Sequence, residues 1–327
     1  MTELNHEAEE TRRAFLGFAL VIASGVVDRF NRGVLFRKIG LVGVGLLGGS
    51  LALAIRERQL AEVLQGYVRR DTSVTECEQA GLKNFANRDL LTVVRDSDLV
   101  ILCTPLAQMR ALAELALPAL KAGAIITDVG SVKGSVVSEL EPLVARAGAH
   151  FIGAHPMAGA EKMGVAAARA GLFCNAVCVL TPTIKSPAAG VQKLEEFWRS
   201  IASRVLKLTP HLHDELVARC SHLPHVVAAE LANYVLNPNH APEQPMLCAN
   251  GFRDTTRIAA GSPEMWRDIA LANRTQLGRA LGAFINDLEE VRRAVETGDV
   301  KAIEQFFTTA KQRRDAWCAQ TASPSPE

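Results

Sequence analysis

The chain has 327 residues, 48% hydrophobic and 22% charged, which favours two globular domains and argues against intrinsic disorder. Its 36 basic and 35 acidic residues leave a formal net charge of +1, so the charge indicates neither a nucleic-acid nor a membrane partner. The seven cysteines are scattered without a C-x-x-C pair, which argues against a zinc ribbon or a disulfide scaffold and fits a cytoplasmic protein.

The first 36 residues are predicted to be a leader outside the folded domains. Residues 14–27 form an apolar run that is shorter than the ~20 residues needed to span a bilayer. Two other interpretations stay open, because the run could form an extra helix and, after its twin arginines, also resembles an export signal. Val34 stands just before the first predicted strand, and a valine codon can start translation. We therefore expect the leader to be disordered or to result from a wrongly chosen start.

A glycine-rich turn is the first functional motif along the chain. Residues 37–42 have the pattern of a short buried strand, and residues 43–48 match G-x-G-x-x-G. Residues 46–58 follow with the apolar spacing of a helix. A strand, a glycine turn and a helix in this order are typical of a dinucleotide-binding site, although glycine-rich tight turns without a ligand also occur.

Each glycine of this motif has a physical role in such a site. Gly43 permits the tight turn, Gly45 lets a pyrophosphate approach the backbone, and Gly48 lets the helix pack against the strand. The free N–H groups at the start of the helix, at Leu46 and Leu47, would then hold the phosphates.

The end of the second predicted strand, residues 63–68, bears on the choice of dinucleotide. An NAD enzyme usually has an acidic residue there that accepts from the ribose 2′-hydroxyl, whereas this chain has Val68. The guanidinium groups of Arg69 and Arg70 could pair with a 2′-phosphate, so the sequence favours NADP over NAD. It stays open that both arginines are solvated and that Asp71 reaches the ribose instead.

Apolar segments alternate with helical stretches through the rest of the first half. Strands are expected at 99–103, 124–128, 151–153, 176–180 and 204–208, with a helix at 109–120. This alternation predicts a parallel sheet covered on both faces, in a dinucleotide-binding domain spanning residues 37–209. Ligands bind at the carboxyl ends of such strands. Three polar clusters follow these ends: Thr104-Pro105, DVGSVKG at 128–134 and GAHPMAG at 153–159.

The second half changes to a helical pattern. A helix is expected over 213–236, with Pro224 as a local break or the first turn of a new helix. After a turn-rich connector, one long helix is predicted from about 263 to 297, and another beyond Gly298-Asp299. The first of these carries an apolar stripe, so we expect residues 210–318 to form a helical dimerisation domain, followed by a disordered tail at 319–327.

Six motifs occur in a fixed order over about residues 37–318. They are GLVGVGLLGGS, TDVGSVKG, GAHPMAG, EKMG, SHLPH and GFRDTTRIA…MWRDI, and together they resemble the prephenate/arogenate dehydrogenase family of tyrosine biosynthesis. The resemblance implies a Rossmann-type domain, an α/β fold that binds NADP or NAD, followed by an all-helical domain that forms a homodimer. It also implies oxidative decarboxylation of prephenate to 4-hydroxyphenylpyruvate, or of arogenate to tyrosine, with hydride transfer to NAD(P)+.

By the same resemblance, His155 in GAHPMAG is the catalytic histidine. A neutral imidazole can accept the substrate hydroxyl proton near pH 7 as the hydride leaves, although a structural histidine at a strand end is the alternative. Ser131 resembles the serine that binds both this histidine and the substrate, close to the cofactor, and it could also cap a helix. Thr104 and Pro105 are further expected cofactor contacts.

The resemblance places the substrate-binding residues in the second half of the chain and in EKMG. Arg257 resembles the arginine that clamps the ring carboxylate, with an interdomain salt bridge as the alternative. His225 in SHLPH resembles a histidine near the substrate side chain. His222 in the same motif is the more structural of the two, and a metal site formed by both histidines is a poor alternative because no third ligand is evident nearby. Residues around the pocket mouth are Glu161, Arg253 and Trp266.

Two other functions are compatible with this domain plan. A 3-hydroxyacid or 6-phosphogluconate type of dehydrogenase would carry a catalytic lysine on the helical domain, and no such motif is seen. A non-enzymatic dinucleotide-sensing regulator would not need His155, Ser131 and Arg257 together. The choice between prephenate and arogenate stays open, and any inhibition by tyrosine is expected at the active site because no regulatory domain is visible.

Overall fold

The computed structural model describes residues 34–159, 163–201 and 204–321. The predicted leader up to residue 33 and the predicted pocket residue Glu161 therefore lie outside the described residues. Within these ranges, no helix is both long and apolar enough to cross a membrane.

A six-stranded parallel sheet forms the first part of the fold. Its strand order is β3-β2-β1-β4-β5-β6, the order of a doubly wound dinucleotide-binding sheet, which confirms the Rossmann-type prediction. The strands are β1 (Phe36–Val42), β2 (Ala61–Tyr67), β3 (Ala86–Asn87), β4 (Leu99–Leu102), β5 (Ile125–Asp128) and β6 (His150–Phe151). Val42 pairs with both Tyr67 and Leu102, so the carboxyl ends of the three central strands lie at one edge.

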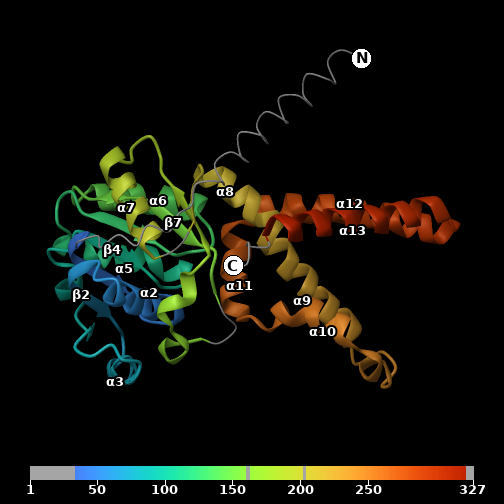
Figure 1. Cartoon of the computed structure of the whole chain (residues 1–327), viewed down its shortest axis with the longest axis horizontal. Helices are drawn as coiled ribbons and strands as arrows, with labels where there is room; N and C mark the ends of the chain where they lie inside the picture. Colours follow the sequence, from blue (N-terminus) through green and yellow to red (C-terminus); the bar gives the residue numbers. More distant parts are fainter. Residues whose placement is uncertain (1–33, 160–162, 202–203, 322–327) are drawn as a thin grey trace, which may run out of the picture. The chain divides into compact units, whose positions relative to one another are not determined.

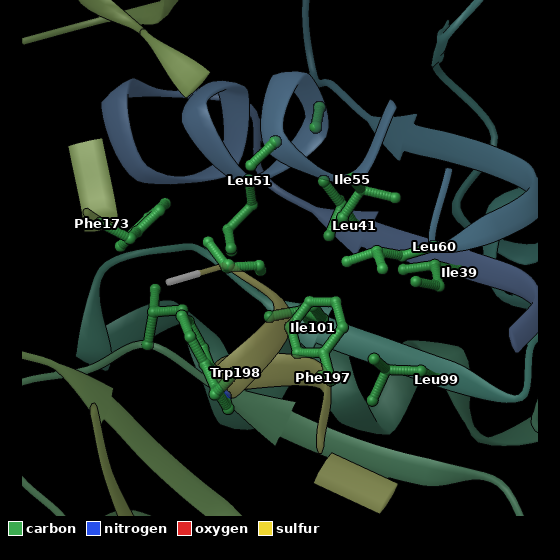
Figure 2. Packing of buried hydrophobic residues seen from close by; sticks show 14 of the residues in the cluster. Ile39, Leu41, Leu51, Ile55, Leu60, Leu99, Ile101, Phe173, Phe197 and Trp198 are labelled. Carbon is green, nitrogen blue, oxygen red and sulfur yellow. The ribbon is translucent and has the colours of Figure 1, made fainter. Parts of the chain in front are cut away.

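Helices cover both faces of this sheet, because alternate residues of each strand point to opposite sides. They are α2 (Leu46–Glu57), α3 (Asp71–Gln79), α4 (Leu90–Val94), α5 (Leu106–Ala116) and α6 (Gly134–Ala145). Leu99 and Ile101 of β4 join the core with α2, whereas Val100 and Leu102 join the core with α5 and α6. Figure 2 shows the first of these cores.

The last three strands form a separate sheet, which corrects the prediction of one continuous parallel sheet. β7 (Gly153–Pro156) runs antiparallel to β8 (Val177–Thr181), and β8 runs parallel to β9 (Arg204–Lys207). The described part of the β7–β8 connection contains only short 3-10 turns rather than the crossover helix that a parallel step requires. Helix α7 (Ala188–Ser200) then packs its aromatic residues into the first core (Figure 2).

The described part of the chain after β9 consists of helices and the turns that connect them. Figure 1 shows its two longest helices, α12 and α13, side by side. Its elements are α8 (Pro210–Val217), a π-helical turn (Ala218–His222), α9 (Leu223–Val235), α10 (Asn250–Thr256), α11 (Pro263–Ala272), α12 (Arg274–Thr297) and α13 (Val300–Thr321), with short 3-10 turns at Gln244–Leu247 and Arg257–Ala260.

Two details of the helical prediction change, and one of the two alternatives for Pro224 is confirmed. The long helix expected over 263–297 is broken at Asn273 into α11 and α12. Pro224 lies in the first turn of α9, directly after the π-helical turn, because proline has no N–H to continue the α-helical hydrogen bonding. Helix α13 continues to Thr321, so the predicted disordered tail is wrong at its start.

Candidate active site

The glycine turn joins β1 to α2 at the carboxyl edge of the sheet. Gly43 has a φ of +97°, and a Cβ there would lie 2.7 Å from Cγ2 of Thr104. A Cβ at Gly48 would collide with the carbonyl oxygen of Gly43. At Gly45, by contrast, a Cβ would meet no atom within 4 Å. The turn is therefore closed on its protein side and open at Gly45, where a ligand phosphate can approach.

The start of α2 offers donors to such a ligand. Gly45 is the N-cap residue, no side chain caps the helix, and its first turn has no acidic residue. The predicted contacts Leu46 and Leu47 are its first two residues. Thr104, which follows β4, has a buried Oγ1 without a hydrogen-bond partner among the described residues, and Pro105 is the N-cap of α5. An open cradle with unused polar groups fits a dinucleotide.

The residues at the end of β2 differ in their burial and in their contacts. Val68 is only 5% exposed and belongs to the core, so it offers no acceptor. Arg69 and Arg70 are exposed directly after it. Asp71 lies in the first turn of α3, where both of its carboxylate oxygens accept from Arg88, at 2.9 and 3.0 Å. The acidic residue that could reach the ribose therefore forms an exposed ion pair with Arg88.

His155 lies on β7 and is 7% exposed. Its main-chain neighbour Ala154 is held by a buried ion pair at the end of β5. Asp128 Oδ1 accepts from Ala154 N at 3.1 Å, and Lys133 Nζ donates both to Ala154 O at 2.9 Å and to Asp128 Oδ2. Lys133 and Asp128 are wholly buried. This ion pair thus holds β7, which carries His155, next to the end of β5, although the two strands belong to different sheets.

The ring of His155 contacts a second histidine from the helical part. His155 Nδ1 lies 2.9 Å from His213 Nε2, and His213 Nδ1 lies 2.8 Å from Asp214 Oδ1. The two rings meet edge to face, with centroids 5.1 Å apart. Asp214 also accepts from the main-chain N–H groups of Lys133 and Gly134, each at 2.8 Å, and thereby caps α6.

Burial dominates the electrostatics of this network. It lowers the pKa of His155 well below the usual histidine range, and the neighbouring His213 and Lys133 act in the same direction. Burial also lowers the pKa of His222 to about 4, against the opposing effect of Asp214. Both imidazoles are therefore neutral at pH 7, which is the form in which a histidine can accept a proton.

A second cluster continues from Asp214 through the helical part. Asn273, at the break between α11 and α12, donates through Nδ2 to Asp214 O at 2.9 Å and lies 3.2 Å from His222 Nδ1. The Trp266 ring stacks on His225 at a centroid distance of 3.7 Å and meets His222 edge to face. The predicted pocket residues His225 and Trp266 thus lie together. Contacts through His222, Asn273, Asp214 and His213 connect them to His155.

Other predicted residues occupy less central positions. Ser131 is half-buried in the loop before α6, and no hydrogen bond among the described residues joins its hydroxyl to His155. It does not cap α6, since Asp214 performs that role, but its main chain approaches His222 and raises the pKa of that ring against the larger effect of burial. Arg253, on α10, and Arg257, at the start of the next 3-10 turn, are both exposed.

Three residues of this network were not predicted from the sequence: His213, Asp214 and Asn273. The only signal for the first two was a His-Asp pair one turn after the Thr209-Pro210 helix start, and polar residues near a helix start are common. Asn273 was hidden because the apolar spacing predicted a continuous helix through it. Among the described residues, no group of three or more His, Cys, Asp or Glu side chains is arranged to hold a metal ion.

Comparison with known proteins agrees with this geometry. Residues 51–207 match the family model "Prephenate dehydrogenase, nucleotide-binding domain", and residues 209–311 match "Prephenate dehydrogenase, dimerization domain". A prephenate dehydrogenase of Bacillus subtilis is 35% identical over 277 residues, covering 84% of this chain and 74% of the relative. A cyclohexadienyl dehydrogenase of Zymomonas mobilis is 33% identical over 282 residues, covering 85% and 95%.

Solved structures extend the likeness to the whole fold. The Aquifex aeolicus prephenate dehydrogenase in complex with hydroxyphenyl propionate and NAD+ has a TM-score of 0.78 and 28% identity, covering 88% of this chain and 100% of that one. The Synechocystis arogenate dehydrogenase has a TM-score of 0.74 and 30% identity, covering 86% and 99%. With both domain models matched in order and relatives above 30% identity over most of its length, the chain belongs to the prephenate dehydrogenase family.

Proposed function

We propose that this chain oxidises and decarboxylates prephenate or arogenate with NADP+ as the preferred hydride acceptor and His155 as the base. The observation that carries the proposal is a buried, neutral His155 held next to a sheet edge that bears an intact dinucleotide cradle. Family membership supplies the reaction class, which is oxidative decarboxylation in tyrosine biosynthesis. The domain boundaries proposed for it are residues 37–209 and 210–318.

The nicotinamide, when bound, supplies the acceptor for the hydride that leaves C4 of the substrate ring. The protein has to remove the hydroxyl proton from the same carbon, which a neutral imidazole does efficiently near neutral pH. Loss of the ring carboxylate as CO2 then makes the ring aromatic. We propose that Arg257 binds this carboxylate and that Ser131, His225, Trp266 and Arg253 complete the substrate site.

Two substitutions separate these roles. His155 acts on a proton that moves with the hydride, so His155→Asn is expected to lower kcat by about 10²–10⁴-fold with little change in KM. Arg257 would bind a group that is already charged in the ground state, so Arg257→Gln is expected mainly to raise KM. Normal turnover by His155→Asn would show that another residue is the base.

The preference for NADP rests on the end of β2. Val68 is a core residue and Asp71 pairs with Arg88, whereas Arg69 and Arg70 are exposed and their guanidinium groups can bind a 2′-phosphate. Replacing both arginines by Gln is expected to lower kcat/KM for NADP at least tenfold relative to NAD, about 1.4 kcal/mol. The control is Arg95→Gln, an exposed arginine at the opposite edge, just before β4. A wild-type enzyme that prefers NAD would contradict this part of the proposal.

Initial rates with prephenate or arogenate, each with NAD or NADP, test the substrate assignment. Turnover of either substrate excludes a dinucleotide-sensing regulator, and the ratio of kcat/KM values identifies the physiological substrate. Because the described residues form only an α/β and a helical part, we propose that any tyrosine inhibition is competitive with substrate at the active site. The dependence on a dinucleotide pool favours the cytoplasm.

We further propose a homodimer formed through the helical part, in line with the matched dimerization-domain model. Exposed apolar side chains on its two long helices support this assignment, because isolated monomers rarely leave so many large ones in water. These side chains are Ile285, Leu288 and Val295 on α12, and Val300, Phe306, Phe307 and Trp317 on α13.

A further inference from the structure

We infer that His213 and Asp214 are positioning residues that fix the tautomer of His155, so that its Nε2 carries the lone pair that takes the substrate proton. The inference rests on the proposed role of His155 as the base. It assigns a function to two residues of α8, which belong to the helical part and lie outside the motifs that indicated the site.

Asp214 determines which nitrogen of His213 carries the proton. One of its oxygens accepts from Lys133 N and the other from Gly134 N, each at 2.8 Å, and a main-chain N–H can only donate. The carboxylate is therefore an acceptor on both oxygens. His213 Nδ1, 2.8 Å from Oδ1, must accordingly be the donor of their shared hydrogen bond.

We infer that His213 holds its proton at Nδ1 alone, since a neutral imidazole carries a single N–H. If His213 Nδ1 carries the proton, its Nε2 has a lone pair and can only accept. His155 Nδ1 lies 2.9 Å from that atom and must donate to it, which leaves His155 Nε2 unprotonated. The opposite tautomer of His155 would set two lone pairs against each other inside a buried contact.

The same arrangement stabilises the base after it has reacted. When His155 takes a proton at Nε2, its Nδ1–H still donates to His213, and the Asp214 carboxylate lies one ring further along. All three groups are less than a tenth exposed, so solvent screens this attraction poorly. Asn273 anchors Asp214 within the helical part, from the α11–α12 break. The contacts of Asp214 with Lys133 N and of His213 with His155 cross to the α/β part, so the base is positioned by the packing of the two parts.

Imidazole nitrogen NMR on protein labelled with ¹⁵N-histidine tests the tautomers directly, without substrate or dinucleotide. His155→Asn, His213→Met and His222→Gln serve to assign the resonances. In the wild-type protein we expect both His155 and His213 to be protonated at Nδ1 and unprotonated at Nε2. Protonation of either ring at Nε2, alone or together with Nδ1, would overturn the inference, whatever the enzyme turns out to catalyse.

Two near-isosteric variants test the consequence for the reaction. His213→Met removes the acceptor and is expected to lower kcat by about 10²-fold with KM changed less than threefold. His213→Gln can offer its amide NH2 to Asp214 and its oxygen to His155, so kcat is expected to recover to within about tenfold of the wild type. His211→Gln, on the same helix but hydrogen-bonded at the surface to Gln276, is the control and should leave kcat unchanged.

Equal kcat values for the Met and Gln variants would overturn the positioning role. If His213→Met fails to fold, the Gln variant and the wild-type nitrogen spectrum still decide the question. The proposed function fails separately, through normal turnover of His155→Asn, and that result would not alter the tautomers that the spectrum reports.

Discussion

Two glycines of the same turn should respond differently to an added methyl group. At Gly45 a Cβ would meet no protein atom within 4 Å, so Gly45→Ala is expected to change the free energy of unfolding by less than about 1 kcal/mol. The methyl group would instead occupy the space of the pyrophosphate and weaken its charge-assisted bonds to the first N–H groups of α2. Losing about 2 kcal/mol in this way raises the dinucleotide Kd roughly 30-fold.

At Gly48 the added Cβ would collide with the carbonyl oxygen of Gly43 and lie 3.2 Å from Cβ of Cys103. The turn would have to shift, so Gly48→Ala is expected to lose about 1–3 kcal/mol of stability as well as affinity. Urea unfolding measures the first quantity and titration calorimetry with NADP and NAD the second. A Gly45→Ala protein that binds both dinucleotides like the wild type would refute the placement of the pyrophosphate at this turn.

Three further predictions concern stability and assembly. Lys133→Met leaves Asp128 unpaired in the interior and is expected to cost about 3–5 kcal/mol in urea unfolding, whereas Lys121→Met, which breaks a surface pair with Asp98, should cost less than about 1 kcal/mol. Burial lowers the pKa of His222 to about 4 in the folded protein, against about 6.5 in the unfolded chain. The free energy of unfolding is therefore retained above pH 6.5 and falls by about 3 kcal/mol from this ring alone as the pH drops toward 4. His222→Gln should flatten this pH dependence in urea unfolding. Phe307→Glu should give monomers in sedimentation experiments, while Leu115→Glu, equally 64% exposed but on α5, should not; a dimeric Phe307→Glu protein would argue against an interface at this side chain.

The residues that could be predicted from the sequence act through local structure. The glycine turn and the strands around it were predicted because a strand, a turn and a helix follow one another within a few residues. His155 was assigned from the resemblance of its short motif GAHPMAG to the family, and the structure places it on β7. Apolar periodicity likewise predicted where the α/β part would end and the helical part begin. Local order of this kind is encoded in neighbouring side chains, and the structure places these elements within a few residues of their predicted bounds.

Tertiary structure alone decided which side chains meet at the site. His155 and His213 are 58 residues apart, and Lys133 N and Asp214 are 81 apart, so no local pattern could indicate that they share hydrogen bonds. The placement of β7 beside the first sheet, too, involves long-range contacts, because the buried Lys133–Asp128 pair bonds to the main chain of Ala154. The pKa of His155 likewise depends on tertiary structure, because it is lowered first by burial and then by His213 of the helical part and Lys133.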